Sequence, residues 1–95
     1  MAARACVRVR IHGQVQGVWY RGWAVDAARG RALAGWVRNR KDGSVEAVFA
    51  GHPASIDAMV EACRQGPPMA RVTDVIREES SDEGWTGFSQ LPTTE

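Results

Sequence analysis

The sequence is short of the residues on which many metal sites, disulfide scaffolds and thiol enzymes depend. Its 95 residues include two cysteines, Cys6 and Cys63, and two isolated histidines, His12 and His52. Two cysteines do not make a disulfide framework, and no group of residues has the spacing of metal ligands. We therefore expect no metal, no cofactor, no cysteine nucleophile and a reducing compartment, the cytoplasm. His12 is expected to face solvent on a strand, and His52 to cap a helix or face water.

Long apolar runs are also missing. No stretch approaches the ~20 apolar residues of a membrane-spanning helix. Residues 1–10 lack the apolar core of a signal peptide. The hydrophobic content of 44% is ordinary for a globular protein. We expect residues 1–95 to form a single domain that does not associate with membranes.

Acidic residues are scarce in the first part of the chain. Residues 1–41 contain nine Lys or Arg and one acidic residue, Asp26, whereas residues 42–95 contain three Arg and ten Asp or Glu. Such an asymmetry can indicate nucleic-acid binding. The asymmetry creates no basic surface if strands from the two parts alternate in one sheet, so its significance depends on the fold.

The first 35 residues predict a strand and a helix. Valine and isoleucine alternate with polar residues over residues 5–12, which indicates a half-buried strand with one face toward water. An alanine-rich segment from Gly22 to about Ala32 favours a helix. Its end remains open between Gly30 and Ala32, because a glycine commonly marks the end of a helix.

A β-hairpin is predicted over residues 36–50, with a three-residue turn at Lys41-Asp42-Gly43. That register pairs Arg38 with Glu46 and keeps the charged pair off the apolar face. A two-residue turn would instead pair Asn39 with Glu46. The basic residues near the turn, Arg38, Arg40 and Lys41, are expected to be solvated.

The remaining elements are a helix and two strands. A helix is predicted over residues 53–65, where four apolar residues recur at helical spacing and form one stripe. These residues are Ile56, Met59, Val60 and Cys63. A strand is predicted over residues 71–79, and its irregular alternation suggests a bulge. A short final strand is predicted over residues 85–91, and the tail beyond Pro92 is expected to fray.

This order of elements predicts an α+β fold. Strand, helix, strand, strand, helix, strand is the split βαβ arrangement of the ferredoxin-like fold, here followed by a short C-terminal strand. In that βαββαβ sandwich, two helices cover one face of a mainly antiparallel sheet. The first and third strands are central neighbours, and the fourth pairs with the first. The basic and acidic parts of the chain would then interleave.

The stretch between the first strand and the first helix is the strongest candidate for a site. It reads Gly13-Gln14-Val15-Gln16-Gly17-Val18-Trp19-Tyr20-Arg21, with no acidic residue. A glycine-bearing turn from strand to helix points several backbone N–H groups into one hollow, and an arginine adds charge and donors. We predict that this loop binds phosphate through its backbone N–H groups and the Arg21 side chain. The residues concerned are Val15, Gln16, Gly17, Val18, Trp19, Tyr20 and Arg21.

The same stretch, Gly-x-Val-Gln-Gly-Val-x-Tyr-Arg, resembles the signature of the acylphosphatases, small enzymes that hydrolyse acyl phosphates. A second segment, Gly35-Trp36-Val37-Arg38-Asn39 followed by Asp42-Gly43, resembles that family's other signature at the expected separation. The resemblance continues through residues 66–68 and 70–72 to Gly87-Phe88. It departs near Arg31 and Ala32, where the family usually has an apolar residue and then a terminating glycine. Trp19 occupies a position where the family often has a smaller residue. Tyr20 occupies a position where the family has an aromatic residue that packs under the loop.

The resemblance implies catalytic roles for two residues, Arg21 and Asn39. From spacing alone, Asn39 is better explained as a turn residue before the hairpin. The resemblance instead implies that its side chain orients the attacking water. It also implies an acyl phosphate substrate, inorganic phosphate as product and inhibitor, no cofactor and metal-independent hydrolysis. A carboxylate leaving group, with a pKa of about 4, needs little help from a general acid. We expect a monomer.

Two other functions remain open at this stage. The ferredoxin-like fold also builds RNA-binding domains, in which aromatic residues on the open sheet face stack on bases. Here that face of the first strand would carry Arg8 and Arg10 with no aromatic between them, so no nucleic-acid partner is expected. A non-catalytic phosphate-binding or anion-binding module is the other alternative, against which the presence of both Arg21 and Asn39 argues.

Overall fold

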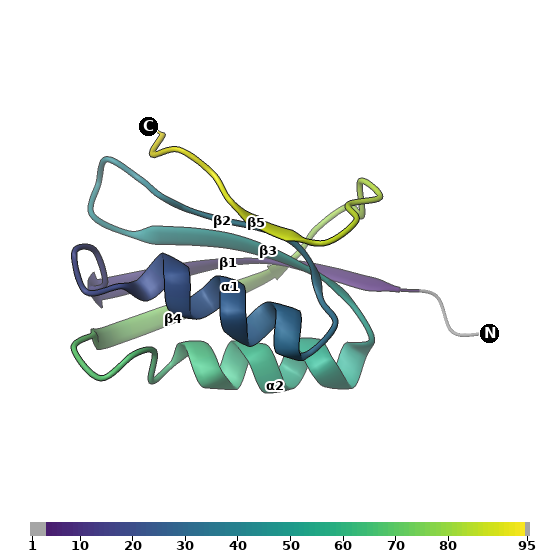
Figure 1. Ribbon diagram of the computed structural model, residues 1–95, viewed down its shortest axis with the longest axis horizontal. Coiled ribbons are helices and arrows are strands. Elements are labelled where there is room, and N and C mark those ends of the chain that lie inside the picture. The colour runs from purple at the N-terminus through teal and green to yellow at the C-terminus, as the bar shows by residue number, and fades with distance from the viewer. Residues whose placement is uncertain (1–3, 95) are drawn as a thin grey trace.

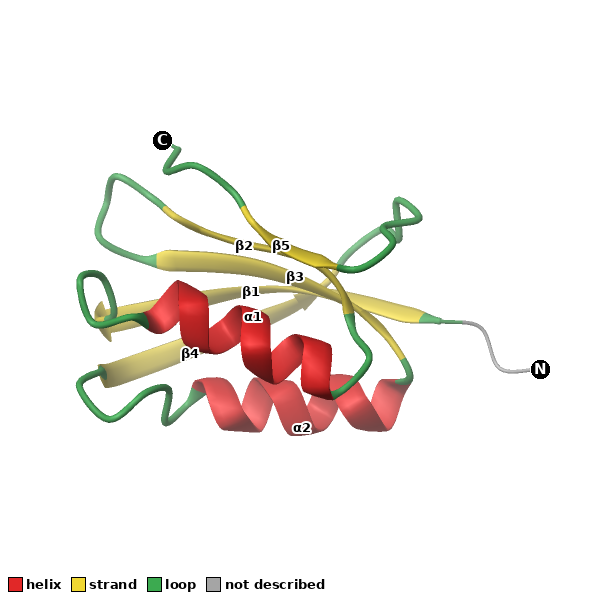
Figure 2. Cartoon of the chain, in the orientation of Figure 1, coloured by secondary structure: helices red, strands yellow, loops and turns green. Residues whose placement is uncertain are grey.

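The computed structural model describes residues 4–94 and shows two helices packed on one face of a twisted sheet (Figures 1 and 2). The elements are β1 (Ala5–Gln14), α1 (Tyr20–Gly30), β2 (Ala34–Asn39), β3 (Val45–Gly51), α2 (Pro53–Cys63), β4 (Arg71–Glu79) and β5 (Phe88–Gln90). None of the helices within residues 4–94 is long and apolar enough to cross a membrane.

The strand order in the sheet is β4-β1-β3-β2-β5. The first four strands pair antiparallel, and β5 pairs parallel to β2. This confirms the predicted ferredoxin-like α+β fold, with β1 and β3 as central neighbours and β4 beside β1. Strands from the basic and acidic parts of the chain therefore alternate across the sheet.

The core lies between the helices and the sheet. The inward-facing residues of β1 are fully buried, and all four residues of the predicted stripe on α2 are buried as well. Phe49 on β3 stacks on Phe88 of β5, with ring centroids 5.5 Å apart. This contact attaches the short edge strand to the core, because an isolated three-residue strand has little stability of its own.

The hairpin adopts the predicted register. Arg38 lies opposite Glu46, and Asn39 lies opposite Val45. The predicted bulge is present between β1 and β4, where the register shifts between His12 and Gly13. Gly13 has a φ of 122°, and a Cβ at this position would lie 2.1 Å from the carbonyl oxygen of Arg71. Only glycine allows this close approach of the two strands.

Helix α1 begins at Tyr20, two residues before the predicted start, and ends at Gly30. The left-handed residue that ends it is Ala32, with a φ of 56°. The amide of Leu33 donates to the carbonyl of Ala28, and that of Ala32 to the carbonyl of Arg29. This is a Schellman motif in which alanine occupies the position usually taken by glycine. The glycine in the sequence therefore marks the last helical residue and not the left-handed cap.

The C-terminal segment differs from its prediction. The final strand spans Phe88–Gln90 and is shorter than the predicted 85–91. Beyond it, the amide of Thr94 donates to the carbonyl of Asn39 at 3.0 Å, and the amide of Lys41 donates to the carbonyl of Thr94 at 2.8 Å. The expected fraying after Pro92 is thus wrong as far as Thr94, and Glu95 lies outside the described residues. The tail thus restrains the backbone from the end of β2 into the turn that follows it.

Candidate active site

A small hollow of about 160 Å³ opens where the loop before α1 meets the ends of β2 and β5. It is lined by Val15, Gly17, Trp19, Tyr20, Arg21, Gly22, Asn39 and Gln90. The structure thus brings together both predicted catalytic residues and most of the predicted loop. Gln16 and Val18 line a neighbouring hollow instead. Sequence reasoning missed Gly22 and Gln90; the position of the second could be inferred only from the parallel pairing of β5 with β2.

The loop backbone presents hydrogen-bond donors that have no partner among the described residues. Among residues 4–94, no carbonyl accepts a hydrogen bond from the backbone N–H groups of residues 16–22. Gly17 and Trp19 both have left-handed backbones, with φ of 73° and 66°. Alternation of handedness along a short segment makes successive N–H groups converge on one point, and the first turn of a helix adds its own free donors. The loop is therefore built to receive an anion.

The side chain of Gln16 ties this loop to the hairpin. Its Nε2 donates to the carbonyl oxygens of Arg40 and Ser44, at 2.7 and 2.9 Å. These residues flank the turn that follows Asn39. The loop and the strand that carries Asn39 are therefore held together by side-chain bonds that the sequence did not reveal, because only a backbone role was expected for Gln16.

Tyr20 anchors the loop from below, as expected of an aromatic at this position. Its hydroxyl is buried and donates to the carbonyl of Cys63 at 2.6 Å. Burial raises the pKa of this hydroxyl, so it remains a donor at any working pH. Burial also raises the pKa of the Cys63 thiol to about 12. Cys63 is a core residue as predicted, and a protonated, buried thiol is not a nucleophile.

Asn39 contributes an acceptor without a donor. The residue is 8% exposed, and its Oδ1 is buried with no hydrogen-bond partner among residues 4–94. Buried side-chain oxygens are nearly always hydrogen-bonded in native proteins, so this atom indicates a place for a water or a ligand. The backbone of Asn39 is held on both sides, by Val45 of β3 and by Thr94. The backbone that carries this side chain is thus held in place, while its Oδ1 has no partner among the described residues.

Arg21 contributes a guanidinium that is similarly unengaged. It lies half-buried in the first turn of α1, and it makes no hydrogen bond or ion pair with another described residue. A cation near the N-terminus of a helix opposes the helix dipole. An arginine at this place is therefore better explained by an anion that it binds than by the stability of the helix.

On the open face of the sheet, a buried carboxylate of β3 pairs with arginines from the strands on either side. Glu46 is 2% exposed and accepts from Arg38 Nε at 3.0 Å and from Arg40 Nη1 at 2.9 Å. Arg8 and Arg10 add ion pairs at 3.5 and 4.0 Å. Burial raises the pKa of Glu46, but the hydrogen bonds and charges of Arg38 and Arg40 outweigh it, and the pKa is lowered. The expectation that Arg38 and Arg40 are simply solvated is wrong.

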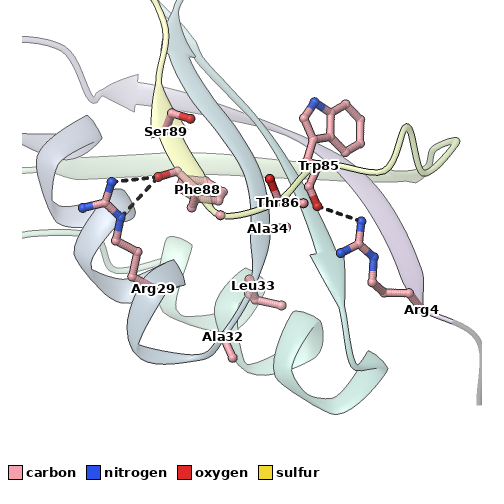
Figure 3. A pocket seen from close by; sticks show the side chains of 10 residues that line it. Arg4, Arg29, Ala32, Leu33, Ala34, Trp85, Thr86, Phe88 and Ser89 are labelled. Atoms are coloured by element: carbon pink, nitrogen blue, oxygen red, sulfur yellow. Dashed lines mark hydrogen bonds between the residues drawn. The ribbon is translucent and has the colours of Figure 1, made fainter.

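A larger hollow of about 580 Å³ lies at the other end of α1 (Figure 3). Its arginines are already engaged: Arg29 donates to the carbonyl of Phe88, and Arg4 donates to Asp82 and to the carbonyl of Trp85. The arginines of this hollow therefore have partners among the described residues, unlike Arg21 in the smaller one. It contains none of the predicted site residues.

The other candidate residues lie elsewhere. His12 is half-buried on β1, and His52 caps α2, where its Nδ1 accepts from the amide of Ala54. Cys6 is buried on the open face of the sheet, beside Ala34 and Val48. No group of three or more His, Cys, Asp or Glu that could hold a metal ion occurs within residues 4–94.

Comparison with known proteins identifies the family. The family model for acylphosphatases matches residues 7–90. An acylphosphatase of Rhodospirillum rubrum is 58% identical over 84 residues, which cover 88% of this chain and 92% of the relative. The solved acylphosphatase structure from Coxiella burnetii aligns with a TM-score of 0.90 at 36% identity and covers 94% of both chains. That from Bacillus subtilis aligns with a TM-score of 0.88 at 41% identity and covers 90% of this chain and 97% of the other. With its paired signatures in one hollow and this extent of similarity, the chain belongs to the acylphosphatase family.

Proposed function

We propose that this enzyme hydrolyses acyl phosphates in the hollow between the 15–21 loop and Asn39, and that residues 1–95 act as one acylphosphatase domain. The acylphosphatase function itself follows from the family. One observation supports the location. Donors of the loop and of Arg21, and the Oδ1 of Asn39, have no partner among residues 4–94, and all belong to residues that line one hollow of about 160 Å³ or the loop beside it. Such a site offers donors to an anion and an acceptor to a water.

The donors would bind the phosphoryl group. In a loose phosphoryl-transfer transition state, charge is spread over the three equatorial oxygens, and catalysis consists mainly of positioning and electrostatic stabilisation. The backbone N–H groups of the 15–21 loop would bind these oxygens. The guanidinium of Arg21 would add charge-assisted bonds, which are stronger than neutral ones and can be bidentate.

The acceptor would orient the nucleophile. A water that donates one hydrogen bond to Asn39 Oδ1 is held with a lone pair free to attack phosphorus. The new P–O bond forms as the bond between phosphorus and the acyl oxygen breaks, and the carboxylate leaves with the electron pair. The proton of the water would pass to a phosphoryl oxygen. Inorganic phosphate and a carboxylate are then the products.

These roles require no metal, because Arg21 and the loop N–H groups supply positive charge and the leaving group is a weak base with a pKa of about 4. We further propose that the enzyme is a monomer. The two cysteines are buried and unpaired, which fits the cytoplasm. On the open sheet face, arginines converge on Glu46 and are partly neutralised, which argues against a nucleic-acid partner.

The test is hydrolysis of benzoyl phosphate in excess chelator by the wild type, Arg21→Ala and Arg64→Ala. Arg64 is an exposed arginine near the end of α2, so its replacement controls for the loss of one charge. We expect wild-type turnover to persist with chelator, Arg64→Ala to match it, and Arg21→Ala to lose about 100-fold or more in kcat/KM. Because Arg21 has no partner among the described residues, its variant should retain the wild-type unfolding temperature. Near-normal turnover by folded Arg21→Ala would refute the phosphate-binding role.

A further inference from the structure

A large aromatic side chain occupies the rim of the hollow at a backbone position that disfavours it. Trp19 has a φ of 66° and a ψ of 26°, and its side chain makes no capping hydrogen bond. Glycine or asparagine adopts this left-handed conformation much more readily than a bulky residue. Strained residues of this kind concentrate at functional sites, which indicates that the indole side chain has a function of its own.

The indole ring packs against Gly22, which serves as its platform. A Cβ placed on Gly22 would lie 2.1 Å from Nε1, 2.7 Å from Cε2 and 2.8 Å from Cδ1 of Trp19. The ring thus rests against the bare Cα of Gly22, one residue after Arg21, and any larger residue would displace it. Gly22 has an ordinary helical backbone, so its lack of a side chain serves this contact and not a turn.

The position of the ring matches the path of the acyl group. The hollow has room for about five groups of the size of water, at roughly 30 Å³ each. A phosphoryl group and one attacking water fill that space, so the acyl group of a bound substrate must extend across the rim. Among the residues that line the hollow, Trp19 carries the one exposed apolar side chain, at 63% exposure, since Val15 and Tyr20 are buried.

We propose that Trp19 is a specificity-determining residue that stacks on the acyl group, and that this enzyme favours aroyl phosphates over acetyl phosphate. The inference rests on the proposed phosphate site. An aromatic acyl group presents a flat face to the indole, whereas an acetyl group covers only a small part of it. Stacking of aromatic pairs predicts a preference of about 10-fold that depends on the indole.

The test compares kcat/KM for benzoyl phosphate and acetyl phosphate in the wild type, Trp19→Asn, Trp19→Phe and Met69→Ala. Asparagine tolerates the left-handed backbone, phenylalanine retains a flat ring, and Met69 is a more exposed apolar residue (74%) that lines the neighbouring hollow. For each enzyme, kcat/KM for benzoyl phosphate is divided by kcat/KM for acetyl phosphate. Dividing this ratio in a variant by the ratio in the wild type cancels the intrinsic reactivity of the two substrates. We expect this quotient to fall about 10-fold in Trp19→Asn and to stay within about 2-fold in the other two.

A second variant keeps the indole but removes its platform. Gly22→Ala should displace the ring and lower the same quotient, while its helical content, measured by circular dichroism, persists. An unchanged quotient in folded Trp19→Asn, with both substrates still hydrolysed, would overturn the role of Trp19 and leave the phosphate site standing. Wild-type enzyme that hydrolyses neither substrate would overturn the proposed function and this inference together.

Discussion

Replacement of Glu46 by glutamine should destabilise the protein substantially, although the change removes no volume. Glu46 is buried at the centre of four arginines, whose side chains are between 23% and 48% exposed. Glutamine keeps one acceptor oxygen but removes the charge and adds an N–H donor. The cluster already has more donors than acceptors, because the buried Nε atoms of Arg10 and Arg40 have no partner among residues 4–94. The variant therefore leaves the arginines to repel one another.

The magnitude follows from the two shortest contacts, with Arg38 and Arg40. A hydrogen bond to a charged group contributes about 1.5–3 kcal/mol. Partial exposure of the arginines allows water to replace part of this interaction, so we expect a loss of about 2–3 kcal/mol in the free energy of unfolding. For a domain of this size, such a loss lowers Tm by about 10–20 °C.

Urea and thermal unfolding of Glu46→Gln and Glu78→Gln provide the assay. Glu78 is exposed on β4, so its replacement controls for the loss of a negative charge. The lowered pKa of Glu46 also sets a pH dependence. Its contribution should be fully present above the unfolded pKa, about 4.3, and disappear as the pH falls through the lower folded value. A destabilisation below about 0.5 kcal/mol at pH 7, or one that persists unchanged in acid, would refute this reasoning.

Two further substitutions test how the loop is held. Gln16→Leu should cost only about 1 kcal/mol of stability, because the carbonyls of Arg40 and Ser44 keep other backbone donors. It should nevertheless raise KM, because the loop loses its attachment to the hairpin. The control is Gln65→Leu, which changes an exposed glutamine after α2, and equal activity of the two variants would contradict the role of Gln16. Tyr20→Phe should lower the free energy of unfolding by about 1–3 kcal/mol, because the carbonyl of Cys63 loses a buried donor; a Tm equal to that of the wild type would show that the hydroxyl contributes nothing.

The order of elements could be predicted from the sequence because each one carries a clear local pattern. Alternation in β1, the stripe on α2 and the glycine-bearing turn of the hairpin all lead to the observed topology, and the pairing of Arg38 with Glu46 followed from keeping charge off the apolar face. The burial of Glu46 did not follow. It depends on arginines that reach it from β1 as well as β2, and no local pattern contains that information.

The candidate site, like the fold, could be predicted from the sequence only in part. Its motif residues could be predicted from the resemblance, whereas the details that hold them depend on contacts between distant segments. The side-chain bonds of Gln16 and the attachment of Thr94 beside Asn39 are of this kind. The left-handed backbone of Trp19 was missed because tryptophan is a poor candidate for that conformation, which is the kind of local conflict that marks a functional position.

Asn39→Ala tests the central claim most directly, with kcat for benzoyl phosphate and the inhibition constant of inorganic phosphate measured on the same preparation. If Asn39 orients water and the loop binds phosphate, kcat should fall about 100-fold or more while phosphate inhibits nearly as well as before. Thermal unfolding establishes that the variant is folded. Comparable losses in kcat and in phosphate affinity would mean that Asn39 binds the phosphate itself, and unchanged kcat would mean that it takes no part in the reaction.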